Sequence, residues 1–176
     1  PLYTEADAHA SLERIAPVDF DHAQKVIGGV SATWQRAGHI LGAASIDVHL
    51  TETDQHVVFS GDLGRPAHPL LAAPPPPPAC EVIVVKSTYG DRDHSPQGLD
   101  ELAELITRTI ARGGSVVIPA FAVDRTEVLL IVLRELMSAG RIPTLPVYVD
   151  SPMALRVLGV YRAAMLAANP LECHPA

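Results

Sequence analysis

Residues 58–65 read Val-Phe-Ser-Gly-Asp-Leu-Gly-Arg, in which an apolar run ends at a glycine and Asp62 follows at once. Residues 37–42 read Ala-Gly-His-Ile-Leu-Gly and place His39 after a glycine in the same way. Glycine allows a sharp exit from a strand and lets the backbone approach a ligand closely. Imidazole and carboxylate are ligands that zinc uses at catalytic sites. Each residue alone is more simply explained as structural, but together they predict a metal-binding sheet edge.

The residues on either side of these loops have the pattern of short β-strands. Apolar stretches at 26–30, 44–50 and 56–60 are each bounded by residues that break strands. Apolar residues in the second stretch alternate with Asp47 and His49, which is typical of a strand with one buried face. The first part of the chain is therefore predicted to be antiparallel β-structure.

A run of prolines at 74–78 follows this part. Because proline favours polyproline II geometry and lacks a backbone donor, the run predicts a stiff surface connector. A ligand for an SH3-like domain is the weaker interpretation. The continuous apolar run at 82–85 then predicts a strand that is covered on both faces.

The period of the apolar residues changes beyond residue 91. They recur at helical spacing over 99–110 and 128–136. Gly113 follows the first of these stretches as a C-terminal cap, and the second ends before Gly140. Two helices are therefore predicted here.

Two buried strands, 115–118 and 147–149, are predicted between and after these helices. Ser151, followed by Pro152, predicts the start of a further helix. Strands that alternate with helices indicate a parallel sheet covered by helices. The expected fold class is thus α/β, with an antiparallel part before about residue 91 and an α/β part after it.

The composition is that of a folded protein with an acidic balance. Hydrophobic residues make up 48% of the chain and charged residues 19%, which excludes a disordered class. A net charge of −7 excludes a surface that is cationic throughout, so any nucleic-acid contact must be local. All the basic residues of 91–176 are arginines, which favours that half as the side facing a polyanion. Ordinary solvated arginines are the open alternative.

The cysteines and the apolar runs bear on the compartment. Cys80 and Cys173 have no C-x-x-C spacing, so neither a zinc ribbon nor a disulfide framework is indicated. No apolar run approaches the roughly 18 residues of a membrane helix, and no leader pattern is seen. We expect a cytoplasmic protein with no membrane contact. Because Pro1 stands first, we also expect a piece of a longer polypeptide.

Five ordered segments resemble the β-CASP branch of the metallo-β-lactamase superfamily, a group of RNA-processing nucleases that includes the RNA-cleaving polyadenylation subunit. The segments are 37–45, 58–65, 87–92, 118–125 and 147–154. The resemblance covers nearly the whole chain. It implies part of a metallo-β-lactamase αββα sandwich over 1–90, followed by part of a β-CASP α/β domain with a parallel sheet over 91–176.

The resemblance also implies roles for the two candidate ligands. His39 would be the lone histidine ligand of one zinc, and Asp62 the carboxylate that bridges two zincs. Paired metals roughly 3.5–4 Å apart can activate a water and stabilise the oxygens of a phosphodiester under attack. Both residues are therefore expected to be catalytic.

The chain departs from the family pattern in its ligand set. The family's His-x-His-x-Asp-His motif does not occur, its later histidines would fall beyond residue 176, and His174 does not match them. His39 and Asp62 are fewer than the three protein ligands that a catalytic zinc keeps. We expect zinc binding by this chain to be weak or absent, and the chain alone to be inactive.

A further departure is Lys86, because the family usually has Glu or Asp before Ser-Thr-Tyr-Gly. A carboxylate there accepts a hydrogen bond from a histidine, whereas an ammonium only donates and repels zinc. Either Lys86 points away, or the site is impaired.

Arg125 and Ser151 are the candidate substrate-binding residues. By the resemblance, Arg125 would line a cleft and contact RNA phosphates, as a guanidinium beside a helix start can do. An Asp124 N-cap beside a surface arginine is the open alternative. Ser151 is expected to start a helix and to help shape the cleft.

The remaining histidines sit in polar or loop-like sequence and match no ligand position. We predict ordinary surface roles for them; they are His9, His22, His49, His56, His68 and His94.

Three functions remain open. The first is a fragment of a dinuclear zinc hydrolase that cleaves single-stranded RNA by endo- or exonucleolytic attack. The second is a non-catalytic subunit that binds RNA or a nuclease and has a degraded metal site, and the third an α/β small-molecule-binding domain. A partial sandwich would leave apolar surface bare, so the chain is expected to form a homodimer, to aggregate or to need further segments that cover this surface.

Overall fold

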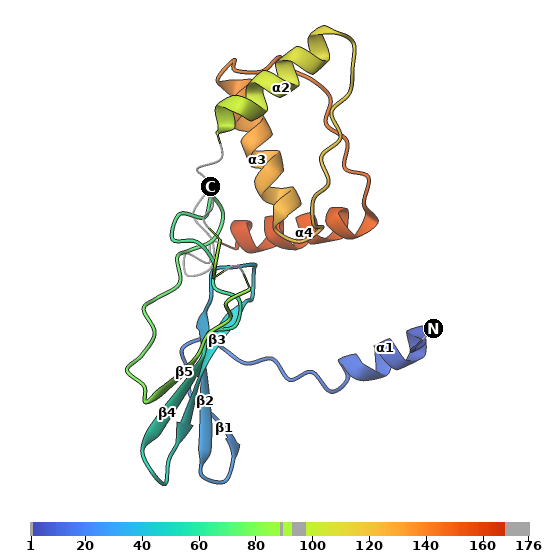
Figure 1. The fold of residues 1–176 in the computed structure, drawn as a ribbon. Helices are drawn as coiled ribbons and strands as arrows, with labels where there is room; N and C mark the ends of the chain where they lie inside the picture. The colour runs from blue at the N-terminus through green and yellow to red at the C-terminus, as the bar shows by residue number, and fades with distance from the viewer. Residues whose placement is uncertain (1, 89, 93–97, 168–176) are drawn as a thin grey trace.

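The computed structural model describes residues 2–88, 90–92 and 98–167, with a β-sheet below and most of the helices above (Figure 1). The elements are α1 (Glu5–Leu12), β1 (Gln24–Ile27), β2 (Val30–Arg36), β3 (Ala44–Leu50), β4 (Gln55–Phe59), β5 (Val82–Val84), α2 (Leu99–Ala111), α3 (Arg125–Ser138) and α4 (Pro152–Leu166).

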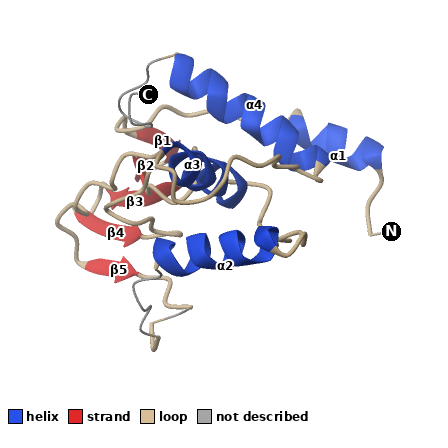
Figure 2. Ribbon diagram, turned by 90° about the horizontal axis from the view of Figure 1, so that it is seen from above, coloured by secondary structure: helices blue, strands red, loops and turns tan. Residues whose placement is uncertain are grey.

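The five strands form one sheet in the order β1-β2-β3-β4-β5, as Figure 2 shows from above. Every neighbouring pair is antiparallel except β4 and β5, which run parallel. A mixed α/β fold with a mostly antiparallel sheet is consistent with part of a metallo-β-lactamase domain. The antiparallel strands expected around the two loops are therefore confirmed.

The predicted strand at 26–30 is wrong, because it spans a hairpin turn. Ile27 pairs with Val30, and Gly28 and Gly29 make the two-residue connection between β1 and β2. Gly29 has a φ of 75°, a left-handed conformation that glycine adopts freely. Apolar residues stand on both sides of the turn, so the apolar pattern predicts one strand although the Gly-Gly pair inside it is a hairpin signal.

Two predictions of strand burial are also wrong. The prediction of a strand at 82–85 is confirmed in position, but its residues are about half exposed instead of covered on both faces. The residues of β3 are all half-buried, so alternation in sequence does not become one buried and one exposed face. A sheet needs a layer packed on it to bury a face, and these faces are only partly covered.

The predicted helices are confirmed, and α2 and α3 pack on a common apolar cluster. Its buried members are Ala103, Ile106, Leu133, Leu136 and Ile142. The backbone turns out of both helices at Gly113 and Gly140, with φ values of 74° and 66°.

The predicted parallel sheet of the second part is wrong for the described residues. Neither 115–118 nor 147–149 is a strand. Val117 and Tyr148 are 87% and 86% exposed, so these segments are not covered as predicted. A strand exists only where a neighbouring backbone takes up its hydrogen bonds, and local sequence does not supply that neighbour.

Helix α1 was not predicted. The Thr4 hydroxyl accepts from the Asp7 amide while the Asp7 carboxylate accepts from the Thr4 amide, which forms a capping box. The helix has no buried residue and stands away from the rest of the molecule in Figure 1. Local capping therefore accounts for this helix better than packing does.

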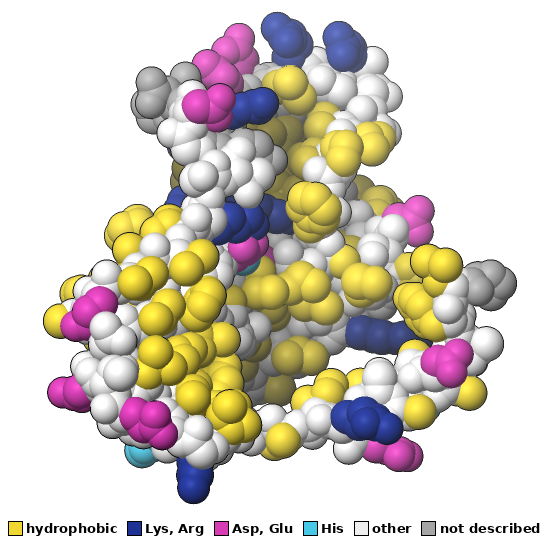
Figure 3. Space-filling model, turned by 60° about the horizontal axis from the view of Figure 1, so that its bottom comes forward, with side chains coloured by type: hydrophobic (Ala, Val, Ile, Leu, Met, Phe, Trp, Pro, Cys, Tyr) yellow, Lys and Arg dark blue, Asp and Glu magenta, His cyan; other side chains and the backbone are white. Residues whose placement is uncertain are grey.

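Large hydrophobic side chains lie exposed on several elements, and Figure 3 shows them spread over one face of the molecule. Such surface is what the expected homodimer requires, but self-association stays a prediction. Within the described part of the chain, no helix has the length and apolar character needed to cross a membrane.

Candidate metal centre

The sheet topology brings three loops to one edge. Strands β4 and β5 are parallel neighbours, so the residues that follow them emerge on the same side. Arg36 at the end of β2 pairs with Ala44 at the start of β3, and Ile46 pairs with Phe59 near the end of β4. The loop that carries His39, the loop that carries Asp62 and the segment that carries Lys86 therefore meet there.

His39, Asp62 and Lys86 converge at this edge. The Nε2 atom of His39 lies 3.6 Å from Oδ2 of Asp62, and Nζ of Lys86 lies 2.5 Å from the same oxygen. The three side chains are between 41% and 49% exposed, so the cluster is open to solvent. Lys86 does not point away, which removes one of the two alternatives drawn from the sequence.

Ser60 fixes Lys86 relative to Asp62. Its amide donates to the Val84 carbonyl over 2.9 Å, its hydroxyl oxygen accepts from the Lys86 amide over 3.1 Å, and its hydroxyl donates to the Gly61 carbonyl over 2.9 Å. Ser60 is 3% exposed, so these bonds are shielded from water. The lysine is thus held beside the carboxylate by the backbone, not only by its flexible stem.

Gly64 packs directly against the loop that carries His39. A Cβ atom at this position would lie 1.7 Å from the carbonyl oxygen of Gly38, a distance no side chain can occupy. The Gly64 amide also donates to the Ala37 carbonyl over 2.7 Å. This close backbone approach, which only glycine permits, places His39 near Asp62.

The electrostatics of the cluster favour an ionised Asp62. The hydrogen bond and charge of Lys86, and then the charge of His39, hold the pKa of the Asp62 carboxyl below its usual value. An ionised carboxylate is the form that binds a metal, but here it already has an ammonium partner.

The residues present form part of a zinc shell. Tetrahedral ligand atoms at 2.0–2.1 Å from zinc stand about 3.3 Å apart, so the His39–Asp62 distance is close to what two ligands need. Within the described ranges, the one group of three metal-ligating side chains lies elsewhere, so no third donor joins this pair. Two donors and a competing ammonium do not make a complete site.

Behind the His39 loop lies a buried polar network formed by His68, Asp124 and Tyr161, which are 5%, 5% and 3% exposed. His68 Nε2 lies 3.1 Å from Asp124 Oδ1, and the Tyr161 hydroxyl donates to the same carboxylate over 3.4 Å. That hydroxyl also accepts from the Leu41 amide over 3.1 Å. The network therefore joins the His39 loop to α4 and to the start of α3.

The prediction that His68 is an ordinary surface residue is wrong. Its Nδ1 accepts from the amides of Leu70 and Leu71 over 3.1 and 3.0 Å, so Nδ1 carries no proton and Nε2 donates to Asp124. Leu70, Leu71 and Tyr161 form the buried part of a second apolar cluster. Folding of the segment after Asp62 onto α4 buries His68, and no local sequence signal announces this.

Asp124 is the central residue of a strained γ-turn. Its φ and ψ are 70° and −54°, and the Arg125 amide donates to the Val123 carbonyl over 2.9 Å. This geometry is rare outside glycine and costs on the order of 1–3 kcal/mol. Asp124 stands at the N-cap of α3, but its side chain makes no capping bond because it faces His68 and Tyr161.

Arg125 and Ser151 lie at helix starts. Arg125 is the first residue of α3 and is exposed. Ser151 caps α4 by accepting from the Ala154 amide over 3.2 Å, so the predicted helix start is confirmed. Among the residues that the structure describes, no hydrogen bond or ion pair connects either residue to His39 or Asp62.

His49 and His56 lie in β3 and β4, as the strands predicted at 44–50 and 56–60 imply, and both are half-buried. His9 lies 3.7 Å from Glu5 on the exposed helix α1. His94 and His174 fall outside the described residues, as does Cys173, and Cys80 is a free thiol.

Glu127, in the first turn of α3, is an unpredicted buried acid. It is 3% exposed, and neither carboxylate oxygen has a hydrogen bond of normal geometry, although the backbone amides of Glu127 and Asp124 lie close enough to oppose part of the effect of burial. Burial, with a smaller contribution from the charge of Asp124, raises the pKa of the Glu127 carboxyl.

We expect Glu127→Met to be more stable than the wild type at pH 7 by about 1 kcal/mol, because it removes unpaired buried oxygens at similar side-chain length. Because the pKa of Glu127 is raised in the folded wild type, protonation favours folding below the pKa that Glu127 has in the unfolded chain. The wild type loses this advantage as the pH rises through the folded-state pKa of Glu127. The difference should therefore shrink as the pH falls toward about 4. Urea denaturation across this range measures it, with exposed Glu135→Met as the control. A pH-independent difference would contradict the assignment.

Sequence comparison places these observations among known proteins. The chain is 34% identical to a ribonuclease of Thermus thermophilus over 99% of its length, and 33% identical to cleavage and polyadenylation specificity factor 73 of Drosophila melanogaster over 96%. It is 28% identical to an RNase J-like protein of Methanocaldococcus jannaschii over 96%. The chain is homologous to the β-CASP nucleases.

The match covers only part of each nuclease. The chain spans 40% of the Thermus ribonuclease, 25% of the Drosophila factor and 40% of the RNase J-like protein. No family model matches the chain. The resemblance to the β-CASP family is thus supported by homology that covers nearly the full chain but less than half of each relative.

Proposed function

We propose that the chain is part of a zinc-dependent hydrolase that cleaves phosphodiester bonds in single-stranded RNA, with His39 and Asp62 as metal ligands. The 3.6 Å approach of these two side chains at one sheet edge supports this most directly. Homology to a ribonuclease and to a polyadenylation cleavage factor supports the reaction class. The division near residue 90 between a metallo-β-lactamase part and a β-CASP part belongs to the same proposal.

In this proposal the chain holds and orients ligands that residues outside it complete. Two zinc ions, when bound, would supply an activated water and stabilise the charge of the reacting oxygens. Gly64 sets the position of the His39 loop, and Lys86 keeps Asp62 ionised. Arg125, exposed beside the amides at the start of α3, binds an RNA phosphate, and Ser151 shapes the cleft by starting α4.

A non-catalytic RNA- or nuclease-binding subunit is the second candidate, and Lys86 favours it. Its ammonium lies 2.5 Å from Asp62 Oδ2, on the carboxylate that a bridging metal needs. A positive charge at this distance opposes a divalent cation at the same oxygen. The two candidates therefore differ in whether zinc displaces Lys86.

Cleavage by the full-length protein separates the candidates. If the hydrolase proposal is right, the wild type cleaves a labelled single-stranded RNA and contains about two zinc ions. Asp62→Asn then lowers the rate about 1000-fold, equal to about 4 kcal/mol. Lys25→Glu, a charge change on exposed β1, is the matched control for Lys86→Glu and should leave cleavage unchanged.

The Lys86→Glu variant tests which residue limits activity. Cleavage that rises in this variant identifies Lys86 as the limiting residue. Ready cleavage by the wild type eliminates the non-catalytic subunit. Absence of both zinc and cleavage in the wild type and in Lys86→Glu would refute the hydrolase proposal.

A further inference from the structure

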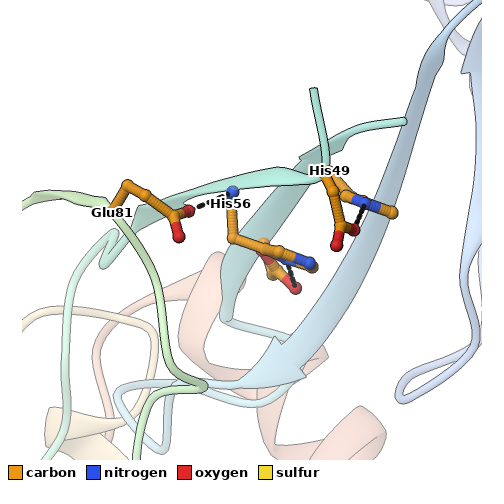
Figure 4. A network of polar contacts seen from close by, with 5 residues as sticks. His49, His56 and Glu81 are labelled. Atoms are coloured by element: carbon orange, nitrogen blue, oxygen red, sulfur yellow. Dashed lines mark hydrogen bonds and ion pairs between the residues drawn. The ribbon is translucent and has the colours of Figure 1, made fainter. Parts of the chain in front are cut away.

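A pair of histidines lies beside the turn between β3 and β4 (Figure 4). Asp62 follows the opposite end of β4, so the pair is remote from it along the strand. His49 and His56 are directly opposite each other on neighbouring antiparallel strands. Their rings are stacked, with centroids 4.3 Å apart and an interplanar angle of 6°. Opposed side chains in a sheet have Cβ atoms only about 5 Å apart, so the two imidazoles are neighbours by construction.

Three carboxylates surround this pair. Asp47 lies 2.9 Å from Nδ1 of His56, and Asp54 lies 3.0 Å from Nε2 of His49. Glu81 accepts a hydrogen bond from the His56 amide over 2.7 Å. The cluster therefore combines two imidazoles with a strongly negative surrounding, which favours a cation.

Asp47 prepares His56 as a ligand. The carboxylate faces Nδ1, so the neutral ring carries its proton there and leaves Nε2 with a free lone pair. Metal-binding histidines almost always donate their second ring N–H to such a group, which orients the ring. His56 thus has this supporting hydrogen bond already in place.

We propose that His49, Asp54 and His56 bind one divalent transition-metal ion of the zinc, nickel or copper type. One ligand atom from each residue lies within 4.8 Å of the others, against about 3.3 Å in a tetrahedral zinc shell. Imidazole and carboxylate together suit these ions better than calcium or magnesium. The ion takes three protein ligands and leaves a position for water.

Side-chain rotation brings the three ligand atoms from within 4.8 Å of one another to the spacing of a zinc shell. Parallel rings do not aim their lone pairs at one point, so binding must tilt His49 out of the stack. The side chains of Asp54 and His49 are 92% and 29% exposed, which leaves them room to move. The proposed ligands do not include His39 or Asp62, so this site does not depend on the proposed hydrolase function.

Zinc titration of the whole metal-free chain tests the proposal. Calorimetry gives the stoichiometry, and nuclear magnetic resonance follows the ring protons. Measurements are made in a His39→Gln, Asp62→Asn background, which removes the other candidate donors. We expect one zinc per chain and shifts of the His49 and His56 resonances. His56→Gln should weaken binding at least 10-fold, while exposed His22→Gln should not change it.

Two further variants refine the test. Asp47→Asn should weaken binding about 10-fold and preserve the stoichiometry, because it replaces the charged acceptor of the orienting hydrogen bond by a neutral amide. Asp54→Asn should also weaken binding. It keeps a turn residue with a φ of 54°, which asparagine adopts readily, so folding is preserved even if a histidine variant fails to fold. Unchanged zinc affinity in Asp54→Asn, or zinc shifts that leave both histidines unaffected, would overturn the proposal.

Discussion

Gly64→Ala is expected to destabilise the protein by about 3 kcal/mol, which at this chain length lowers Tm by about 9 °C. The added methyl group would stand 1.7 Å from the Gly38 carbonyl oxygen and 2.7 Å from the His39 amide nitrogen. Both contacts are with backbone, so no side-chain rotation relieves them. The two loops must separate, which also breaks the 2.7 Å bond from Gly64 to Ala37.

Gly159→Ala is the matched control and should act in the opposite direction. Gly159 lies inside α4, and a methyl group there would meet nothing within 4 Å. Alanine is a better helix former than glycine, so this change should stabilise by about 0.5–1 kcal/mol. Urea denaturation followed by circular dichroism measures both variants. Equal stability of Gly64→Ala and wild type would show that the two loops do not pack as described.

His68→Ala is expected to destabilise by about 4 kcal/mol, because it leaves a cavity and removes the Nε2 N–H that donates to the buried Asp124 carboxylate. The substitution also leaves the Leu70 and Leu71 amides without the ring nitrogen that accepts from them. Buried donors without partners add to the cost. The strained turn at Asp124 loses one of its two side-chain partners at the same time.

Exposed His22→Ala provides the comparison and should stay within about 0.5 kcal/mol of the wild type. Tyr161→Phe, which removes only a hydroxyl, should cost about 1 kcal/mol. Because burial raises the pKa of Tyr161 to about 12, this hydroxyl stays neutral throughout the measurement. The double variant should cost less than the sum, since both residues act on Asp124. Strict additivity would show that they do not form one network.

The His39 and Asp62 loops illustrate how far sequence alone reached. A glycine followed by a polar side chain identified both loops, because these residue types have distinct backbone preferences. Lys86 follows Val85 directly and stood out only against the family pattern. Periodicity likewise located α2 and α3, since each presents an apolar stripe, and the Ser151 cap followed by Pro152 located the start of α4. That Lys86 points at Asp62 depends on β4 and β5 being parallel neighbours, which periodicity does not encode.

The segments 115–118 and 147–149 show the opposite case. Their apolar character predicted strands, but the described structure gives them no neighbouring strand. The burial of His68 was likewise not predictable from local sequence. His68 lies in a proline-containing stretch that is typical of a surface loop, but it is only 5% exposed. Its burial requires α4, about 90 residues further along the chain.

The sequence by itself determined the three confirmed helices, the positions of β3, β4 and β5, and the residues His39, Asp62 and Lys86 as the places to look. These follow from local backbone preferences and side-chain chemistry, except Lys86, which stood out only against the family pattern. The turn inside 26–30 had a local signal, the Gly28-Gly29 pair, which the apolar pattern alone passed over. Only the tertiary structure decided that Lys86 faces Asp62 and that His68, Asp124 and Tyr161 form one buried network. These depend on which distant segments become neighbours, because hydrogen bonds and burial are completed across the fold and not along the chain.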